Sequence, residues 1–188
     1  MHMLIDRITE DVRTALAKDP AATSAVTVAL LYPGLHAVWG YRIAHALWER
    51  GFTFIARLLS QVVRALTGVE IHPAAEVGRR LFIDHGAAVV VGETADIGDD
   101  VLMYHGVTLG GDSMRREKRH PTLEDGVTVG ANATLVGDIT VGENATVGAG
   151  SVVVEAVPPE TTVAGAPAEP VDGTGAERLP GECESGQP

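Results

Sequence analysis

Several kinds of residue are scarce in this sequence of 188 residues, and each shortage excludes something. A single cysteine, Cys183, rules out a disulfide within the chain and fits a reducing compartment. Basic residues number 14 against 25 acidic ones, and the net charge of −11 argues against a nucleic-acid partner, because phosphate backbones need a basic surface. Aromatic residues make up only 4% of the chain, so we expect an aliphatic core.

Long apolar runs are also missing. No segment reaches the roughly 20 apolar residues that span a membrane. Residues 1–10 include charged positions where a secretory signal peptide would have its apolar region. We therefore expect a cytoplasmic protein without a membrane partner.

Residues 1–69 are predicted to form a small helical N-terminal domain. Apolar residues recur there at spacings of three and four, which place them on one face of a helix. The pattern is interrupted at Pro20, Pro33, Gly51 and Gly68. The sequence therefore predicts four helices before the chain changes character.

A different period begins at Ile71 and is the strongest signal in the chain. Aliphatic residues, called guide residues below, recur six apart with one slip of two residues and one interruption. They are Ile71, Val77, Ile83, Val91, Ile97, Met103, Leu109, Leu123, Val129, Leu135, Val141, Val147 and Val153. A period of six fits neither an α-helix nor a flat strand. It is typical of a β-helix solenoid whose coil contains three hexads, each a short strand and a corner.

The predicted solenoid covers residues 70–168. A polar loop over 110–122 interrupts it and carries most of the basic residues of this part of the chain. A long loop extruded from a compact solenoid is commonly functional. Residues 169–188 are rich in Gly, Glu and Pro, so they are predicted to form a flexible C-terminal tail.

Several motifs together resemble the serine acetyltransferase family. They are Glu70-Ile71-His72-Pro73-Ala74-Ala75, Phe82-Ile83-Asp84-His85-Gly86, Val91-Gly92-Glu93-Thr94, Val107-Thr108-Leu109-Gly110-Gly111, Arg119-His120-Pro121 and Ala164-Gly165-Ala166-Pro167-Ala168. The resemblance implies a mainly β fold with α, a left-handed parallel β-helix after the helical domain. It also implies a serine O-acetyltransferase, which moves acetyl from acetyl-CoA to the hydroxyl of L-serine in the first step of cysteine biosynthesis.

The resemblance implies a role for each matching residue. His85 matches the family's general base, which takes the proton of the serine hydroxyl as that oxygen attacks the thioester. Glu70 matches the carboxylate that orients the base, although many family members have Asp there.

Four further residues match the family's substrate contacts. Asp19 and Asp84 match its acidic contacts to the substrate ammonium. Arg119 and His120 match the pair that binds the substrate carboxylate, for which a guanidinium fork is well suited.

Acetyl-CoA is the implied co-substrate, and no metal is implied. Its pantetheine arm is expected along backbone at Gly111, Ala131 and Ala149, in a groove between adjacent β-helices. The implied assembly is a homotrimer with active sites between subunits, and L-cysteine is the implied feedback inhibitor. A complex with O-acetylserine sulfhydrylase, which in the family uses a C-terminal isoleucine, is not supported by a chain that ends in Pro188.

Three alternatives stay open. Another hexapeptide acyltransferase, acting on a sugar or a different amino acid, would share the fold and His85. A zinc hydratase similar to the γ-class carbonic anhydrases would use His85, His105 and His120 as ligands. A scaffold without activity would keep the fold alone.

Overall fold

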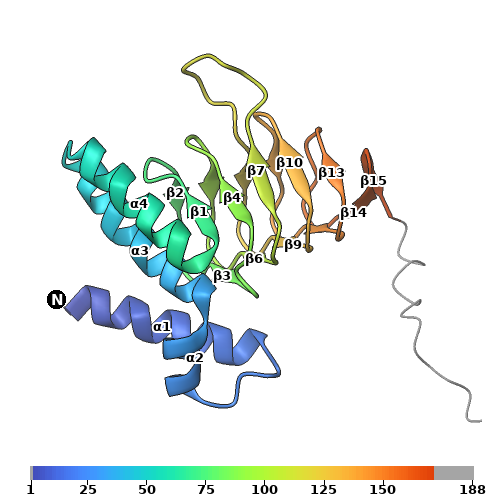
Figure 1. Cartoon of the computed structure of the whole chain (residues 1–188). Coiled ribbons are helices and arrows are strands. Elements are labelled where there is room, and N and C mark those ends of the chain that lie inside the picture. Colours follow the sequence, from blue (N-terminus) through green and yellow to red (C-terminus); the bar gives the residue numbers. More distant parts are fainter. Residues whose placement is uncertain (1, 172–188) are drawn as a thin grey trace, which may run out of the picture.

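The computed structural model describes residues 2–171, in which four helices precede a triangular solenoid of short strands (Figure 1). The helices are α1 (His2–Lys18), α2 (Ala25–Leu31), α3 (Pro33–Glu49) and α4 (Thr53–Thr67). They confirm the four predicted helices. Pro33 begins α3 rather than only interrupting the pattern, because the first turn needs no N–H from it. None of the helices in the described range is long and apolar enough to cross a membrane.

The strands form three sheets, one for each side of the triangle. The first sheet consists of β1 (Val69–Ile71), β4 (Val89–Val91), β7 (Thr108–Gly110), β10 (Thr134–Val136) and β13 (Val152–Val153). The second consists of β2 (Glu76–Val77), β5 (Asp96–Ile97), β8 (Thr122–Leu123) and β11 (Thr140–Val141). The third consists of β3 (Phe82–Ile83), β6 (Leu102–Met103), β9 (Thr128–Val129), β12 (Thr146–Val147), β14 (Thr162–Gly165) and β15 (Ala168–Pro170). All pairings are parallel except that of β14 with β15, which confirms the parallel β-helix.

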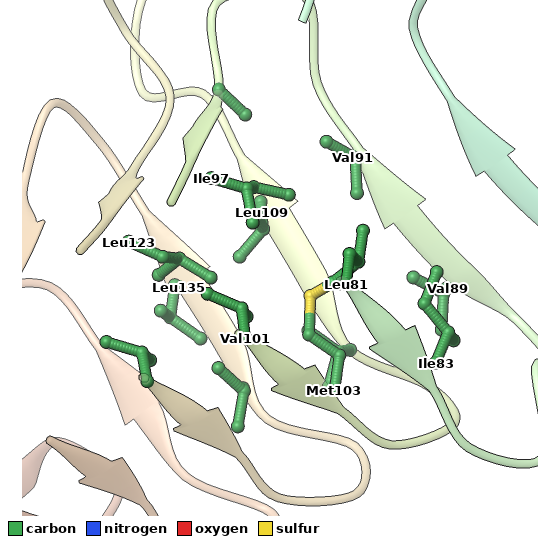
Figure 2. Close-up of a cluster of buried hydrophobic side chains, with 14 of the residues drawn as sticks. Leu81, Ile83, Val89, Val91, Ile97, Val101, Met103, Leu109, Leu123 and Leu135 are labelled. Carbon is green, nitrogen blue, oxygen red and sulfur yellow. The ribbon is translucent and has the colours of Figure 1, made fainter. Parts of the chain in front are cut away.

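The guide residues become inward-facing columns inside the solenoid. In the first sheet, the strand register places one guide residue of each coil directly above that of the coil before it: Ile71, Val91, Leu109, Leu135 and Val153. Figure 2 shows side chains from successive coils pointing into this common interior. Every guide residue is buried except Val77, which is partly buried at the end nearest the helices. Burial of each such side chain contributes about 1.5–3 kcal/mol, so the repeated aliphatic position is the main source of stability.

The helical part docks on the first coil through close backbone contact. At Gly34, near the start of α3, an added Cβ would lie 2.0 Å from the carbonyl oxygen of Ile83, so no side chain fits. The Tyr41 hydroxyl donates to the carbonyl of Ala75 at 2.5 Å. Farther out, Asp11 of α1 is buried and accepts from Trp39. These contacts hold the junction of α2 and α3 beside the turn that follows β3.

The loop and the tail differ slightly from the predicted bounds. Gly110 and Thr122 lie in β7 and β8, so the extruded segment is 111–121, the long loop that projects from the solenoid in Figure 1. Glu169 and Pro170, predicted as part of the tail, instead lie in β15, because the chain turns back and pairs with β14. Val171 N still donates to the carbonyl of Thr162, and residues 172–188 of the predicted tail lie outside the described residues.

Candidate active site

The corners of the coils stack into edges, and two edges carry the predicted site residues. The His85 edge joins the third sheet to the first and comprises the turns 84–88, 104–107, 130–133 and 148–151. The His120 edge joins the first sheet to the second and comprises the segments 72–75, 92–95 and 111–121. Backbone hydrogen bonds tie successive turns together, as from Asn132 N to the carbonyl of His105 and from Gly150 N to that of Ala131.

His85 lies just after β3 with its ring on the outside of the solenoid. Its side chain is 69% exposed. The backbone has φ 61°, the left-handed conformation that a tight turn requires. One oxygen of Asp84 accepts from the His85 backbone N at 2.8 Å, and the other lies 3.6 Å from His85 Nε2. An imidazole placed in this way can take up and release a proton.

His85 and Asp84 line a pocket of about 310 Å³, whose opposite wall is the junction of α1, α2 and α3. Asp19 lies in that wall and accepts from the Tyr32 hydroxyl at 2.5 Å and from Ala21 N at 2.7 Å. The bond from Tyr32, followed by that from Ala21, lowers the pKa of Asp19. The bond to Asp19 raises the pKa of Tyr32 to about 12. The pocket therefore presents an ionised carboxylate, which suits an ammonium group.

The sequence does not predict a place beside this pocket for Tyr32 or for His105. Nothing local distinguishes Tyr32, because many tyrosines precede a proline. The sequence suggests His105 only as a zinc ligand. Its ring meets that of His85 from the next coil at a centroid distance of 5.7 Å, with the planes at 70°. Its Nδ1 is buried and has no hydrogen-bond partner among the described residues.

On the His120 edge, the ring of His120 is buried, with 8% of the residue exposed. Its Nδ1 accepts from Thr94 N at 3.2 Å and lies 2.8 Å from Thr94 Oγ1. The ring fills the space over Gly92, where an added Cβ would lie 1.9 Å from it. Burial, and then the charge of Arg119, lowers the pKa of His120. The ring is therefore neutral near pH 7 and carries its hydrogen on Nε2, where it can donate to a carboxylate.

Arg119 is held beside His120 at the base of the extruded loop. Its Nη2 lies 2.6 Å from the carboxylate of Glu93, and its Nη1 donates to the carbonyl of Arg115 at 3.1 Å. The bond from Arg119 lowers the pKa of Glu93. Arg119 and Glu93 line a pocket of about 890 Å³ between the loop and the ends of α3 and α4, at Trp48 and Thr53.

Glu70 does not meet His85 within the described chain. It lies in the middle of β1, and its carboxylate is 3.0 Å from Arg64 of α4. The carboxylate that lies beside the His85 ring is that of Asp84. The predicted pairing of Glu70 with His85 is therefore not formed inside one subunit, because β1 places Glu70 on a flat side of the solenoid and not at an edge.

The predicted site residues thus fall into two groups. On the His85 edge, or facing it, are His85, Asp84, Asp19, Ala131 and Ala149. On the His120 edge are Arg119, His120 and Gly111. A strand of the first sheet separates the two edges, and three residues of strand already span about 10 Å. One chain cannot bring both groups onto a ligand as small as an amino acid.

The zinc alternative meets the same separation. His85 and His105 share one edge, whereas His120 lies on the other. None of the three belongs to the group of potential metal ligands that the described part of the chain brings together.

The fold and the outward-facing imidazole on its edge define a class, the hexapeptide-repeat transferases, and residues 120–154 match the bacterial transferase hexapeptide (six repeats) family. A serine acetyltransferase from Mycobacterium tuberculosis is 53% identical over 159 residues, which cover 85% of this chain and 69% of the relative. The chain therefore belongs to the serine acetyltransferase family, which confirms the resemblance seen in its motifs, and it is an acyltransferase.

Solved structures agree with this assignment. The serine acetyltransferase of Neisseria gonorrhoeae, in complex with serine, has a TM-score of 0.86 and 42% identity, covering 90% of this chain and 70% of that one. A serine acetyltransferase in complex with cysteine has a TM-score of 0.89 and 40% identity, and the match covers 90% of this chain and 70% of that one. The similarity includes the solenoid fold, which is left-handed in these proteins.

Proposed function

We propose that this chain transfers the acetyl group of acetyl-CoA to the hydroxyl oxygen of L-serine, giving O-acetyl-L-serine and CoA. The observation that carries the proposal is the exposed imidazole of His85 in a pocket walled by the carboxylates of Asp84 and Asp19. The proposed location is the cytoplasm, which supplies acetyl-CoA and fits a chain with a single cysteine.

The proposed mechanism is general-base catalysis of acyl transfer. The substrate ammonium binds between Asp19 and Asp84, which directs the hydroxyl toward His85. The neutral imidazole takes the hydroxyl proton as the oxygen attacks the thioester carbon, and a tetrahedral intermediate forms. Its collapse breaks the carbon–sulfur bond, and the imidazolium returns the proton to the departing thiolate. Proton transfer of this kind contributes about 10²–10⁴-fold to the rate.

The substrate carboxylate is proposed to bind Arg119 and His120. Arg119 is already oriented by Glu93, and His120 presents its Nε2 hydrogen. Both groups lie on the His120 edge, so the binding of one serine requires a second subunit. We propose a homotrimer in which the His85 edge of one subunit faces the His120 edge of the next. This head-to-tail contact closes into a ring with three equivalent sites.

The same arrangement supplies a place for acetyl-CoA. Ala131 and Ala149 lie on the edge of His85 in later coils, and Gly111 lies on the other edge. Small side chains at these positions let the pantetheine arm approach the backbone, and the proposed groove between subunits leads it to His85. Glu70 lies on the flat side between the two edges, so in the trimer we propose that it faces the His85 of the neighbouring subunit.

L-Cysteine is the proposed inhibitor. It has the ammonium and carboxylate of serine, so the same contacts can hold it, and a relative has been solved in complex with cysteine. Its thiol takes the place of the hydroxyl that would react. Inhibition competitive with serine is therefore expected.

The test is acceptor-dependent consumption of acetyl-CoA by the purified chain. Thioester absorbance should fall with L-serine and stay almost constant with L-homoserine or L-threonine, and mass spectrometry should detect O-acetylserine. Addition of L-cysteine should raise the KM for serine without changing kcat. Equal turnover of homoserine, or no turnover with any acceptor, would contradict the proposal.

A further inference from the structure

Three potential metal ligands converge where α3 crosses the start of the second sheet, next to the segment 72–75, and none of them lines either pocket of the proposed active site. They are His45 and Glu49 on α3 and Glu76 at the start of β2. One ligand atom of each lies within 4.8 Å of those of the other two. His45 and Glu49 are one helical turn apart and so share a face of α3, while Glu76 comes from the strand below it.

The His45 ring is oriented as a metal-ligating histidine is. Its Nδ1 lies 2.9 Å from the carbonyl oxygen of Pro73. A carbonyl can only accept, so Nδ1 carries the hydrogen and Nε2 of the neutral ring keeps its lone pair. That Nε2 lies 4.0 Å from a carboxylate oxygen of Glu76. The ring of Tyr41 packs against the imidazole at 5.4 Å and limits its rotation. A backbone carbonyl on one ring nitrogen is the usual outer-shell partner of a metal-bound histidine.

The charged groups that meet this imidazole are the carboxylates of Glu49 and Glu76. Among the described residues, neither Glu49 nor Glu76 forms an ion pair with a lysine or arginine. Within the described chain, two carboxylates and one lone pair therefore meet without a lysine or arginine in ion-pair contact with them.

We propose that His45, Glu49 and Glu76 bind one divalent transition cation of the Zn²⁺ type. Bonds of about 2.0–2.2 Å would join the metal to the imidazole nitrogen and to one oxygen of each carboxylate. The two glutamates are exposed, so their side chains can rotate to close the site. An imidazole ligand favours Zn²⁺, Co²⁺ or Ni²⁺ over Mg²⁺ and Ca²⁺, which prefer oxygen ligands only. The bound metal would fasten α3 to the first coil. This proposal does not depend on the proposed function.

The test uses the full chain without an affinity tag and with Cys183→Ser, because a thiol binds Zn²⁺ by itself. After treatment with a chelator and its removal, Zn²⁺ is titrated calorimetrically, and the absorption of Co²⁺ reports the coordination. We expect one Zn²⁺ per chain and a rise in melting temperature on binding. His45→Gln and Glu49→Gln should each weaken the affinity at least about tenfold and remove most of that rise.

A matched control is His36→Gln. His36 is another partly buried imidazole of α3, and its Nε2 lies 2.9 Å from the carbonyl of Ala29. This variant should bind Zn²⁺ as the parent does. Absence of Zn²⁺ binding by the parent would overturn the proposal, and so would equal affinity in the parent and in a Glu49→Gln/Glu76→Gln double variant.

Discussion

The two edges that carry the site residues are built in different ways. On the His85 edge the imidazole is 69% exposed, and its only ion-pair partner in the described chain is the preceding aspartate. On the His120 edge the ring is 8% exposed, and Thr94, Glu93 and Arg119 are joined around it by hydrogen bonds. The chain thus fixes the groups proposed to bind a carboxylate and leaves free the group proposed to exchange a proton. Four predictions test this difference.

The largest effect is expected at His85. His85→Asn keeps a residue that tolerates the left-handed backbone but removes the base. We expect kcat to fall about 10²–10⁴-fold, with an unchanged melting temperature because the side chain is exposed. Acetyl-CoA consumption and a thermal melt measure the two quantities. Full activity in this variant would remove His85 from the mechanism.

The second prediction tests whether the two edges act in different subunits. The His85→Asn and Arg119→Gln variants, each assembled alone, should both be nearly inactive at low serine. Unfolding and refolding them together in equal amounts should restore about a quarter of the sites, in which one subunit supplies each intact edge. Refolding each variant alone is the control. If the mixture gains nothing over the separate variants, a site shared between subunits is contradicted.

A smaller effect is expected at Arg119, the cation that Glu93 holds in place. Arg119→Gln should raise the KM for serine about 10–100-fold, because a charge-assisted hydrogen bond contributes about 1.5–3 kcal/mol. The KM for acetyl-CoA should change much less. Arg116→Gln alters a cation on the same loop, outside the bonds that hold Arg119, and should leave the KM for serine unchanged. Equal effects of the two variants would mean that only the charge of the loop matters.

The smallest effect concerns acid stability, which we assign to the His120 edge. There burial lowers the pKa of His72 from 6.5 to about 4. The unfolded chain therefore binds more protons between these values, and the stabilising contribution present above pH 6.5 is lost as the pH falls toward 4. His72→Asn, whose side-chain oxygen can still accept from Ala74 N, should flatten the decline in melting temperature over this range. An unchanged pH profile would show that other groups cause it.

Much of the fold could be predicted because its signal is local and repeated. The guide residues set the strand, the corner and the inward face of each hexad, and the register of Ile71, Val91 and Leu109 follows from their spacing. The helix ends were predicted from proline and glycine. The last strand was missed because β15 has no guide residue and pairs in the opposite direction.

The motifs named the candidate site residues one by one, and the resemblance implied a site between subunits, but the positions of these residues within one chain could not be predicted. The motifs identified His85 and His120, but no motif indicates that they lie on different edges. The edge of each residue depends on the position that it takes within its own coil, after β3 for His85 and before β8 for His120. The ion pair of Glu70 with Arg64 depends on how α4 packs on β1, which no sequence pattern expresses. The bond from Tyr32 to Asp19 arises because α1 and α2 meet beside β3.

The reversed direction of β15 has a further consequence for how long the solenoid can grow. A stack of parallel coils ends in unpaired backbone groups, which could receive the first coil of another molecule and so begin a fibre. β15, the last strand of the described residues, runs antiparallel to β14 and carries Pro170, which has no N–H to donate to an added strand. At the other end, the helices lie where a preceding coil would stack (Figure 1). Within the described chain, an antiparallel strand thus closes the third sheet at one end and the helices cover the first coil at the other, so both features work against the addition of a further parallel coil.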